Sequence, residues 1–228
     1  PQGICDRAAG IARFKAKSMG TLEVIAPQGS KADRLLVLGL GKPDDLTDYD
    51  WMRAGGAAAA GFKSATDVVV FLDAPGIEVE AARAADFALG VMLRGYSFDT
   101  YKTKKKDDEE KPPKKVSVTI VTSAHAQAEA MLAEAQAVAG GILLARDLAN
   151  LPPNVLGPVE FADKAKALEA LGVEVEILDE QAMQELKMGA LLGVTQGSAR
   201  PPRLAVMQWK GGKPEDTPIA FVGKGVVF

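Results

Sequence analysis

Short apolar runs separated by helical stretches constrain the fold of this chain more than any other feature. Residues 34–41 (RLLVLGLG), 67–73 (DVVVFLD) and 116–122 (VSVTIVT) have the length and β-branched content of buried strands. Between them, apolar residues recur every three or four positions over 48–65 and 78–96, which is typical of helices. This alternation predicts an α/β fold in which the three runs form a central parallel sheet covered on both faces.

A long amphipathic helix is predicted after this first group of elements. It covers residues 127–150 and ends at Asn150, because Pro152 and Pro153 cannot continue a helix. We expect it to connect two domains. The predicted division is an N-terminal α/β domain over 1–125, a linker helix over 126–150 and a second α/β unit over 151–228.

The second unit again alternates helices and strands. Pro158 suits the first turn of a helix, and Gly172 suits its end. Residues 173–179 (VEVEILD) alternate apolar and acidic side chains, which indicates an edge strand with one solvated face. Further strands are predicted at 203–209 and at 218–223, and the second of these is fully apolar.

Charge and composition restrict the partners. The chain has 27 Lys and Arg against 30 Asp and Glu, a net charge of -3, so a nucleic acid is not expected as the main partner. Residues 102–115 (KTKKKDDEEKPPKK) place acids beside the lysines, which favours a solvated loop over a nucleic-acid patch. No apolar run approaches the ~20 residues that span a bilayer, and no signal peptide is recognisable. We expect a cytoplasmic protein with no membrane partner.

Several common catalytic motifs are incomplete. One cysteine, Cys5, and one histidine, His125, exclude a zinc site built from thiolates and give no hydrolytic triad. The sequences GLGK (39–42) and GKG (223–225) lack the spacing of phosphate-binding loops and are interpreted as tight strand exits. The sequence therefore predicts no cofactor-binding loop.

With these motifs excluded, Lys224 is the remaining candidate for a functional residue. It lies between Gly223 and Gly225 at the end of an apolar run, IAFVGKGVVF. In one interpretation its stem packs on the protein and its ammonium group reaches water. In the other, the glycines let a metal centre approach closely, and the neutral amine acts as a ligand or base.

Three segments closely resemble the leucyl aminopeptidase family, the cytosolic two-metal exopeptidases. They are ARDLANLPPNVLGPVEFADKA, MGALLGVTQGSARPPRLAVMQW and IAFVGKGVVF; upstream, LLVLGLGK and GYSFDTYKTKK are similar to the N-terminal domain of the same family. The resemblance implies a macrodomain-like N-terminal domain, a linker helix and the beginning of an α/β metallo-exopeptidase domain, truncated at Phe228. The loop QGSARPP (196–202) is given a structural role and no catalytic one.

The resemblance also implies a site. Lys224 occupies the position of a family ligand to one of two divalent ions, Mn²⁺ or Zn²⁺ with Mg²⁺ as a third candidate. The remaining ligands and the catalytic lysine and arginine of the family lie beyond Phe228, so no catalytic residue is expected within these 228 residues and the fragment alone is expected to be inactive.

For the complete enzyme, the resemblance implies a homohexamer that releases N-terminal amino acids, leucine preferred, from peptides with a free N-terminus by means of water activated by two metals. The alternative is a binding module, in which the N-terminal domain acts as a nucleotide- or DNA-binding regulator. The charge balance disfavours DNA.

Overall fold

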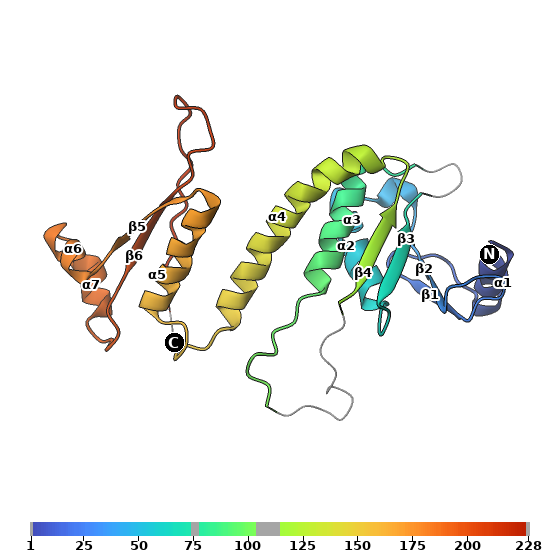
Figure 1. Ribbon diagram of the computed structural model, residues 1–228, viewed down its shortest axis with the longest axis horizontal. Coiled ribbons are helices and arrows are strands. Elements are labelled where there is room, and N and C mark those ends of the chain that lie inside the picture. Colours follow the sequence, from blue (N-terminus) through green and yellow to red (C-terminus); the bar gives the residue numbers. More distant parts are fainter. Residues whose placement is uncertain (1, 74–77, 104–114, 227–228) are drawn as a thin grey trace. The chain divides into compact units, whose positions relative to one another are not determined.

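The computed structural model describes residues 2–73, 78–103 and 115–226 (Figure 1). The chain divides into two compact units, Pro1–Ala145 and Arg146–Phe228, which are described separately below. Most of the loop predicted at 102–115 lies outside the described residues.

The first unit contains the predicted α/β alternation. Its elements are α1 (Gln2–Ala12), β1 (Thr21–Ile25), β2 (Arg34–Leu38), the short helix η1 (Pro43–Asp45), α2 (Asp48–Ala60), β3 (Asp67–Phe71), α3 (Ala81–Arg94), β4 (Ser117–Val121) and α4 (His125–Asn150), which continues into the second unit. The helices predicted at 48–65, 78–96 and 127–150 are thus confirmed as α2, α3 and α4.

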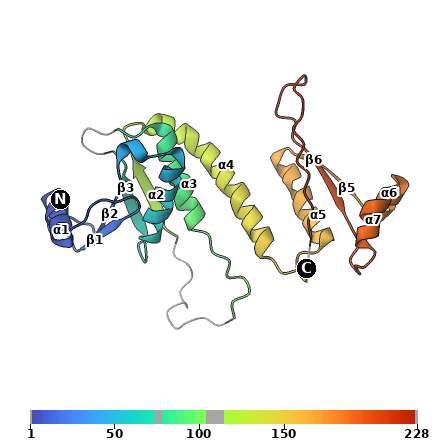
Figure 2. The same cartoon turned by 180° about the vertical axis from the view of Figure 1, so that it is seen from behind.

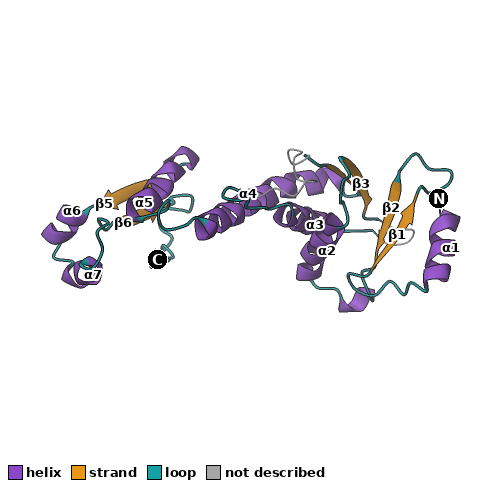
Figure 3. Cartoon of the chain, turned by 90° about the horizontal axis from the view of Figure 1, so that it is seen from below, coloured by secondary structure: helices purple, strands orange, loops and turns teal. Residues whose placement is uncertain are grey.

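The sheet prediction for this unit is partly wrong. Strands β3 and β4 pair in parallel, with Val68 opposite Val118, as expected. Strand β2 instead pairs antiparallel with β1, a strand that the sequence analysis missed, and Leu22 lies opposite Val37 (Figure 3). The short connection between β1 and β2 explains this arrangement, because neighbouring segments joined by a short loop pair most readily as an antiparallel ribbon.

The core of the first unit lies between α2, α3 and one face of the strands. Ala54, Ala58 and Phe87 form its buried centre, and partly buried residues from β3 and β4 pack against them, including Val70 and Ile120. The opposite face of β3 carries Val69 and Phe71, which are 58% and 74% exposed. In the described part of the chain the parallel strands are therefore covered on one face, not on both as predicted.

Helices α2 and α3 cross at two buried glycines. A Cβ atom added to Gly55 would lie 2.9 Å from the carbonyl carbon of Phe87 and 3.0 Å from the amide nitrogen of Val91. One added to Gly90 would lie 2.8 Å from the carbonyl carbon of Met52. Real Cβ atoms do not approach backbone this closely, so glycine is what allows the two helix backbones to come together (Figure 2).

Arg34 attaches the β1–β2 ribbon to the end of α2. Its guanidinium donates hydrogen bonds to the carbonyl oxygens of Gly61 (2.8 Å) and Phe62 (3.2 Å) and forms an ion pair with Glu23. Lys63 pairs with the same carboxylate at 2.8 Å. Hydrogen bonds from Lys63 and Arg34 hold the pKa of Glu23 below its ordinary value.

Asp73 joins the carboxyl ends of β3 and β4. Its carboxylate accepts a hydrogen bond from the backbone N–H of Val79, at 2.9 Å, and another from the N–H of Ser123. These two bonds, with the bond from Val79 the larger cause, hold the pKa of Asp73 below its ordinary value. The carboxylate therefore connects the end of β3 to the residues before α3 and to those after β4.

We expect Asp73→Asn to destabilise the protein more at pH 7 than at pH 3. A carboxyl whose pKa is lowered by folding contributes stability above its unfolded pKa of about 3.9, and this contribution is lost as the pH falls through the folded value. Thermal unfolding at both pH values measures the difference. Asp33→Asn, on the exposed surface, is the control. An equal loss for Asp73→Asn at both pH values would contradict the assignment.

Helix α4 departs from the expectation that no segment is long and apolar enough to span a bilayer. By length and composition it is long and apolar enough to cross a membrane, and it is the one such helix among the described residues. Polar residues interrupt the apolar runs of α4, so no run is long, but the many alanines between them raise the mean hydropathy of the helix. A single helix of this kind is weak evidence for a membrane span, because helices of globular proteins meet the same criterion.

The second unit consists of a helix packed on a two-stranded sheet, with two short helices in the connection between the strands and an extended segment after the second strand (Figure 1). Its elements are α5 (Pro158–Lys166), the short helix η3 (Ala167–Leu171), β5 (Glu174–Leu178), α6 (Glu180–Glu185), α7 (Gly189–Thr195) and β6 (Leu204–Gln208). Strands β5 and β6 pair antiparallel, with Glu176 opposite Val206. The predicted helix start at Pro158, the end at Gly172 with its positive φ of 87°, and the strands at 173–179 and 203–209 are confirmed.

The strand predicted at 218–223 is wrong for this structure. Residues 218–226 have no regular secondary structure, and Phe221 and Val222 are 94% and 99% exposed. Strand β6 pairs with β5 and, within the described ranges, with no other strand. The backbone N–H and C=O groups of a strand form their hydrogen bonds with a neighbouring strand. An apolar run without such a neighbour therefore forms no strand, even when its residues favour β structure.

Candidate functional site

Lys224 lies on an exposed segment without regular secondary structure, so the interpretation of GKG (223–225) as a tight strand exit is wrong for this structure. No ion pair involving this residue occurs within the described parts of the chain. Its two glycine neighbours differ. A Cβ added to Gly225 would lie 2.7 Å from Cε1 and 3.0 Å from Cδ1 of Phe161, whereas one added to Gly223 would meet nothing within 4 Å.

Arg200 ties the loop at 196–202 to the segment that precedes α5. Its guanidinium donates to the carbonyl oxygens of Pro153, at 2.6 Å, and Asn154, at 3.2 Å. The structural role predicted for this loop is in keeping with these bonds. Arg200 could not be identified from the sequence, because its neighbours in the chain do not indicate which distant carbonyl groups its side chain will bind.

Glu160 fixes the start of α5. One carboxylate oxygen accepts a hydrogen bond from the backbone N–H of Gly157 at 2.9 Å, and Arg200 lies 4.0 Å from the same oxygen. Its own backbone N–H, that of Gly157 and the charge of Arg200 hold the pKa of Glu160 below its ordinary value, against partial desolvation. A Cβ at Gly157 would lie 2.7 Å from this oxygen and would also meet the Arg200 guanidinium, so a side chain here would have to displace the ends of both side chains.

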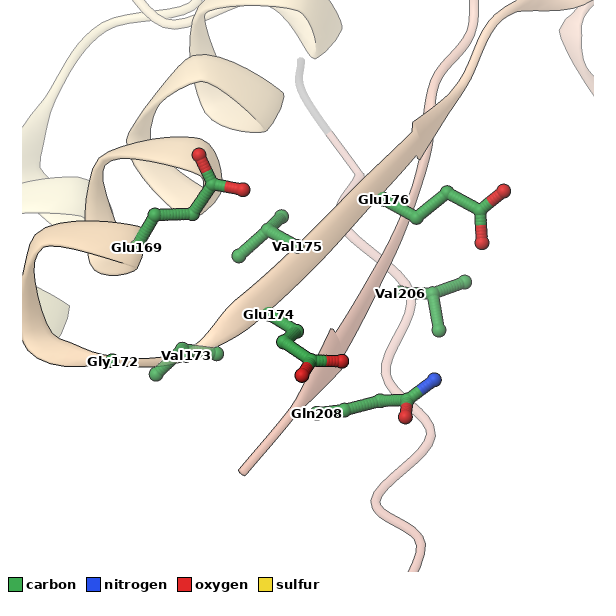
Figure 4. A pocket seen from close by; sticks show the side chains of 8 residues that line it. All are labelled: Glu169, Gly172, Val173, Glu174, Val175, Glu176, Val206 and Gln208. Carbon is green, nitrogen blue, oxygen red and sulfur yellow. The ribbon is translucent and has the colours of Figure 1, made fainter. Parts of the chain in front are cut away.

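A shallow cavity on the β5–β6 sheet contains three carboxylates but is not a metal centre. It has a volume of about 470 Å³, and its lining residues include Glu169, Glu174 and Glu176 (Figure 4). Glu169 pairs with Lys166 at 2.8 Å, and Glu174 pairs with Lys210 at 2.6 Å. Across the described ranges, no group of three His, Cys, Asp or Glu side chains is placed to hold a metal ion.

The GLGK segment is a strand exit, as predicted. It follows β2 directly, and the Gly39 and Gly41 amides donate to the carbonyl oxygens of Gly20 (2.7 Å) and Ala16 (3.0 Å). Gly41 has a positive φ of 84°, which favours glycine. These amides are occupied by the chain itself, so the segment does not form a phosphate cradle.

Two family models match this chain. The model of the N-terminal domain of the cytosol aminopeptidase family matches residues 2–105, and the model of its catalytic domain matches residues 143–228. The chain belongs to the cytosol aminopeptidase family. It contains the N-terminal domain and the start of the catalytic domain, and the predicted family and α/β fold class are confirmed.

Curated relatives give the same result. A protein named probable cytosol aminopeptidase from Agrobacterium fabrum is 69% identical over 228 residues, covering 100% of this chain and 46% of the relative. A protein of the same name from Rhizobium meliloti is 59% identical, with the same coverage of each chain. The chain thus spans about half the length of the curated relatives it matches.

Solved structures of longer proteins share the fold. A mutant of tomato leucine aminopeptidase has a TM-score of 0.73 and 27% identity, covering 90% of this chain and 40% of that one. The bottromycin maturation enzyme BotP, in complex with Mn, has a TM-score of 0.70 and 25% identity, covering 91% of this chain and 42% of that one. None of the comparisons supports the alternative of a nucleotide- or DNA-binding module.

Proposed function

We propose that the full-length protein carrying this chain is a metal-dependent aminopeptidase that releases N-terminal residues, leucine preferred, from peptides. The observation that carries the proposal is the catalytic-domain match over residues 143–228, which includes Lys224. We also propose that the protein is a cytoplasmic homohexamer with the three-part division given above, an N-terminal domain over 1–125, a linker helix over 126–150 and a catalytic part from residue 151. The resemblance of the sequence to the leucyl aminopeptidase family supports both.

The residues present fit a metal centre in part. Lys224 supplies one nitrogen donor, exposed and flanked by glycines, and a solved structure of a similar protein in complex with Mn supports a divalent cation as the metal. We assign Lys224 as a ligand of one of two ions, Mn²⁺ or Zn²⁺ with Mg²⁺ as a third candidate. Such ions, when bound, supply an activated water and polarise the scissile carbonyl.

The contribution of this chain to the reaction is one metal ligand, the side-chain amine of Lys224. A lysine nitrogen has a lone pair for a cation only when it carries no proton, so Lys224 must bind in its neutral form. Its glycine neighbours have no side chains that would block the approach of a second group to the backbone. The role of these residues is therefore to hold a neutral donor close to the bound ion.

Chelation tests the proposal. We expect full-length protein to hydrolyse leucine p-nitroanilide, to lose this activity on dialysis against a chelator, and to recover it when Mn²⁺, Zn²⁺ or Mg²⁺ is added back, because the water nucleophile depends on bound metal. The release of p-nitroaniline is measured before and after each step. Activity that survives removal of metal, confirmed by elemental analysis, would refute a metal-dependent mechanism.

A further inference from the structure

The first turn of α5 is held from several sides. The N–H of Phe161 donates to the carbonyl oxygen of Gly157 at 2.9 Å, while the carboxylate of Glu160 binds back to the Gly157 amide. Arg200 fixes the preceding segment through the carbonyl oxygens of Pro153 and Asn154. The backbone that carries Phe161 is thus anchored to both its own N-terminal turn and the loop at 196–202.

The Phe161 ring lies against the backbone of Gly225. The ring atoms Cε1 and Cδ1 occupy the space in which a side chain at position 225 would begin. Although Phe161 is 38% exposed, an aromatic side chain on a helix has few allowed rotamers, and these direct it towards the preceding turn. A side chain at position 225 must therefore displace either the ring or the segment that carries Lys224.

The two glycines beside Lys224 consequently have different physical roles. Gly223 has open space at its Cβ position, so its immediate surroundings impose no steric need for glycine. Gly225 is in contact with a ring on an anchored helix. Position 223 therefore has open space around its Cβ, whereas position 225 is in contact with the Phe161 ring.

We propose that Phe161 is a positioning residue whose ring sets the backbone of Gly225 and thereby the place from which the Lys224 amine reaches a divalent ion. The inference rests on the proposed assignment of Lys224 as a metal ligand. The inference adds that Phe161, on helix α5, determines the position of this ligand. Phe161 itself touches neither metal nor substrate.

A double-mutant cycle on the full-length protein tests the inference. The variants are Gly225→Ala, Phe161→Ala and the double variant, with Phe161→Leu as a second background that keeps apolar volume but lacks the ring atoms. The thermal midpoint of metal-free protein and the Mn²⁺ dissociation constant from calorimetry are measured for each. We expect Gly225→Ala to weaken Mn²⁺ binding about tenfold with Phe161 intact, and less than about twofold in either Phe161 background.

Gly223→Ala in the same three backgrounds is the matched control, and its effect should not depend on residue 161. If Gly225→Ala and Phe161→Ala are additive in the thermal midpoint, the contact is not formed and the inference is wrong. If they couple in the midpoint but not in Mn²⁺ affinity, while Lys224→Ala still weakens binding, the positioning role is wrong and the metal assignment stands. If Lys224→Ala leaves Mn²⁺ affinity unchanged, the metal assignment itself fails and the positioning role fails with it.

Discussion

Gly55→Ala is expected to lower the stability of the first unit by about 3 kcal/mol, a fall in thermal midpoint of about 10 °C for a unit of this size. The added methyl would collide with the backbone of α3 at Phe87 and Val91, and backbone atoms cannot rotate away as a side chain can. The two helices must move apart to remove this clash, and their separation opens the core around Ala54, Ala58 and Phe87. Thermal or urea unfolding followed by circular dichroism measures the loss.

Gly56→Ala is the matched control. It makes the same change one residue further along α2, but its Cβ would lie 3.8 Å from the carbonyl oxygen of Gly90, an ordinary contact. Since alanine is favoured over glycine inside a helix by about 1 kcal/mol, the midpoint should stay level or rise. Equal losses for the two variants would show that α2 and α3 do not cross at Gly55.

The helices were predicted well because the periodicity and end signals of a helix lie within the helical segment itself. The periodicity over 48–65 and 78–96 gave α2 and α3, and Pro158 and Gly172 gave both ends of the helical stretch that opens the second unit. The crossing at Gly55 and Gly90 was not predictable, since the sequence does not say which residues of two helices meet. A glycine inside a helix is the sole local sign of such a contact.

Strand formation depended on a partner strand, which the sequence of the segment itself does not reveal. Residues 21–25 form β1 because β2 is nearby, while the more apolar residues 218–223 form no strand because no partner lies beside β6 in the described residues. The same limit applies to the candidate site. Lys224 was found from its glycine neighbours and from family resemblance, but its support by Phe161 depends on a contact between residues far apart in the sequence.

Lys224→Ala in the full-length protein is expected to reduce kcat/KM for leucine p-nitroanilide by at least about 100-fold. Loss of groups that merely support a metal ligand costs about 10- to 100-fold, and loss of the ligand itself should cost no less. The metal content of the desalted protein should fall in parallel. Lys213→Ala is the control, because it truncates the same type of side chain in an exposed loop of the same unit.

Lys224→Arg separates a ligand from a simple positive charge. Arginine keeps the charge and most of the length, but its guanidinium does not lose a proton in proteins and so offers no lone pair to a cation. If Lys224 binds metal, the arginine variant should lose metal and activity as fully as the alanine variant. If Lys224 instead acts through its charge, for example on a substrate carboxylate, the arginine variant should keep its metal and much of its activity. That result would overturn the ligand assignment while leaving the family membership of the chain untouched.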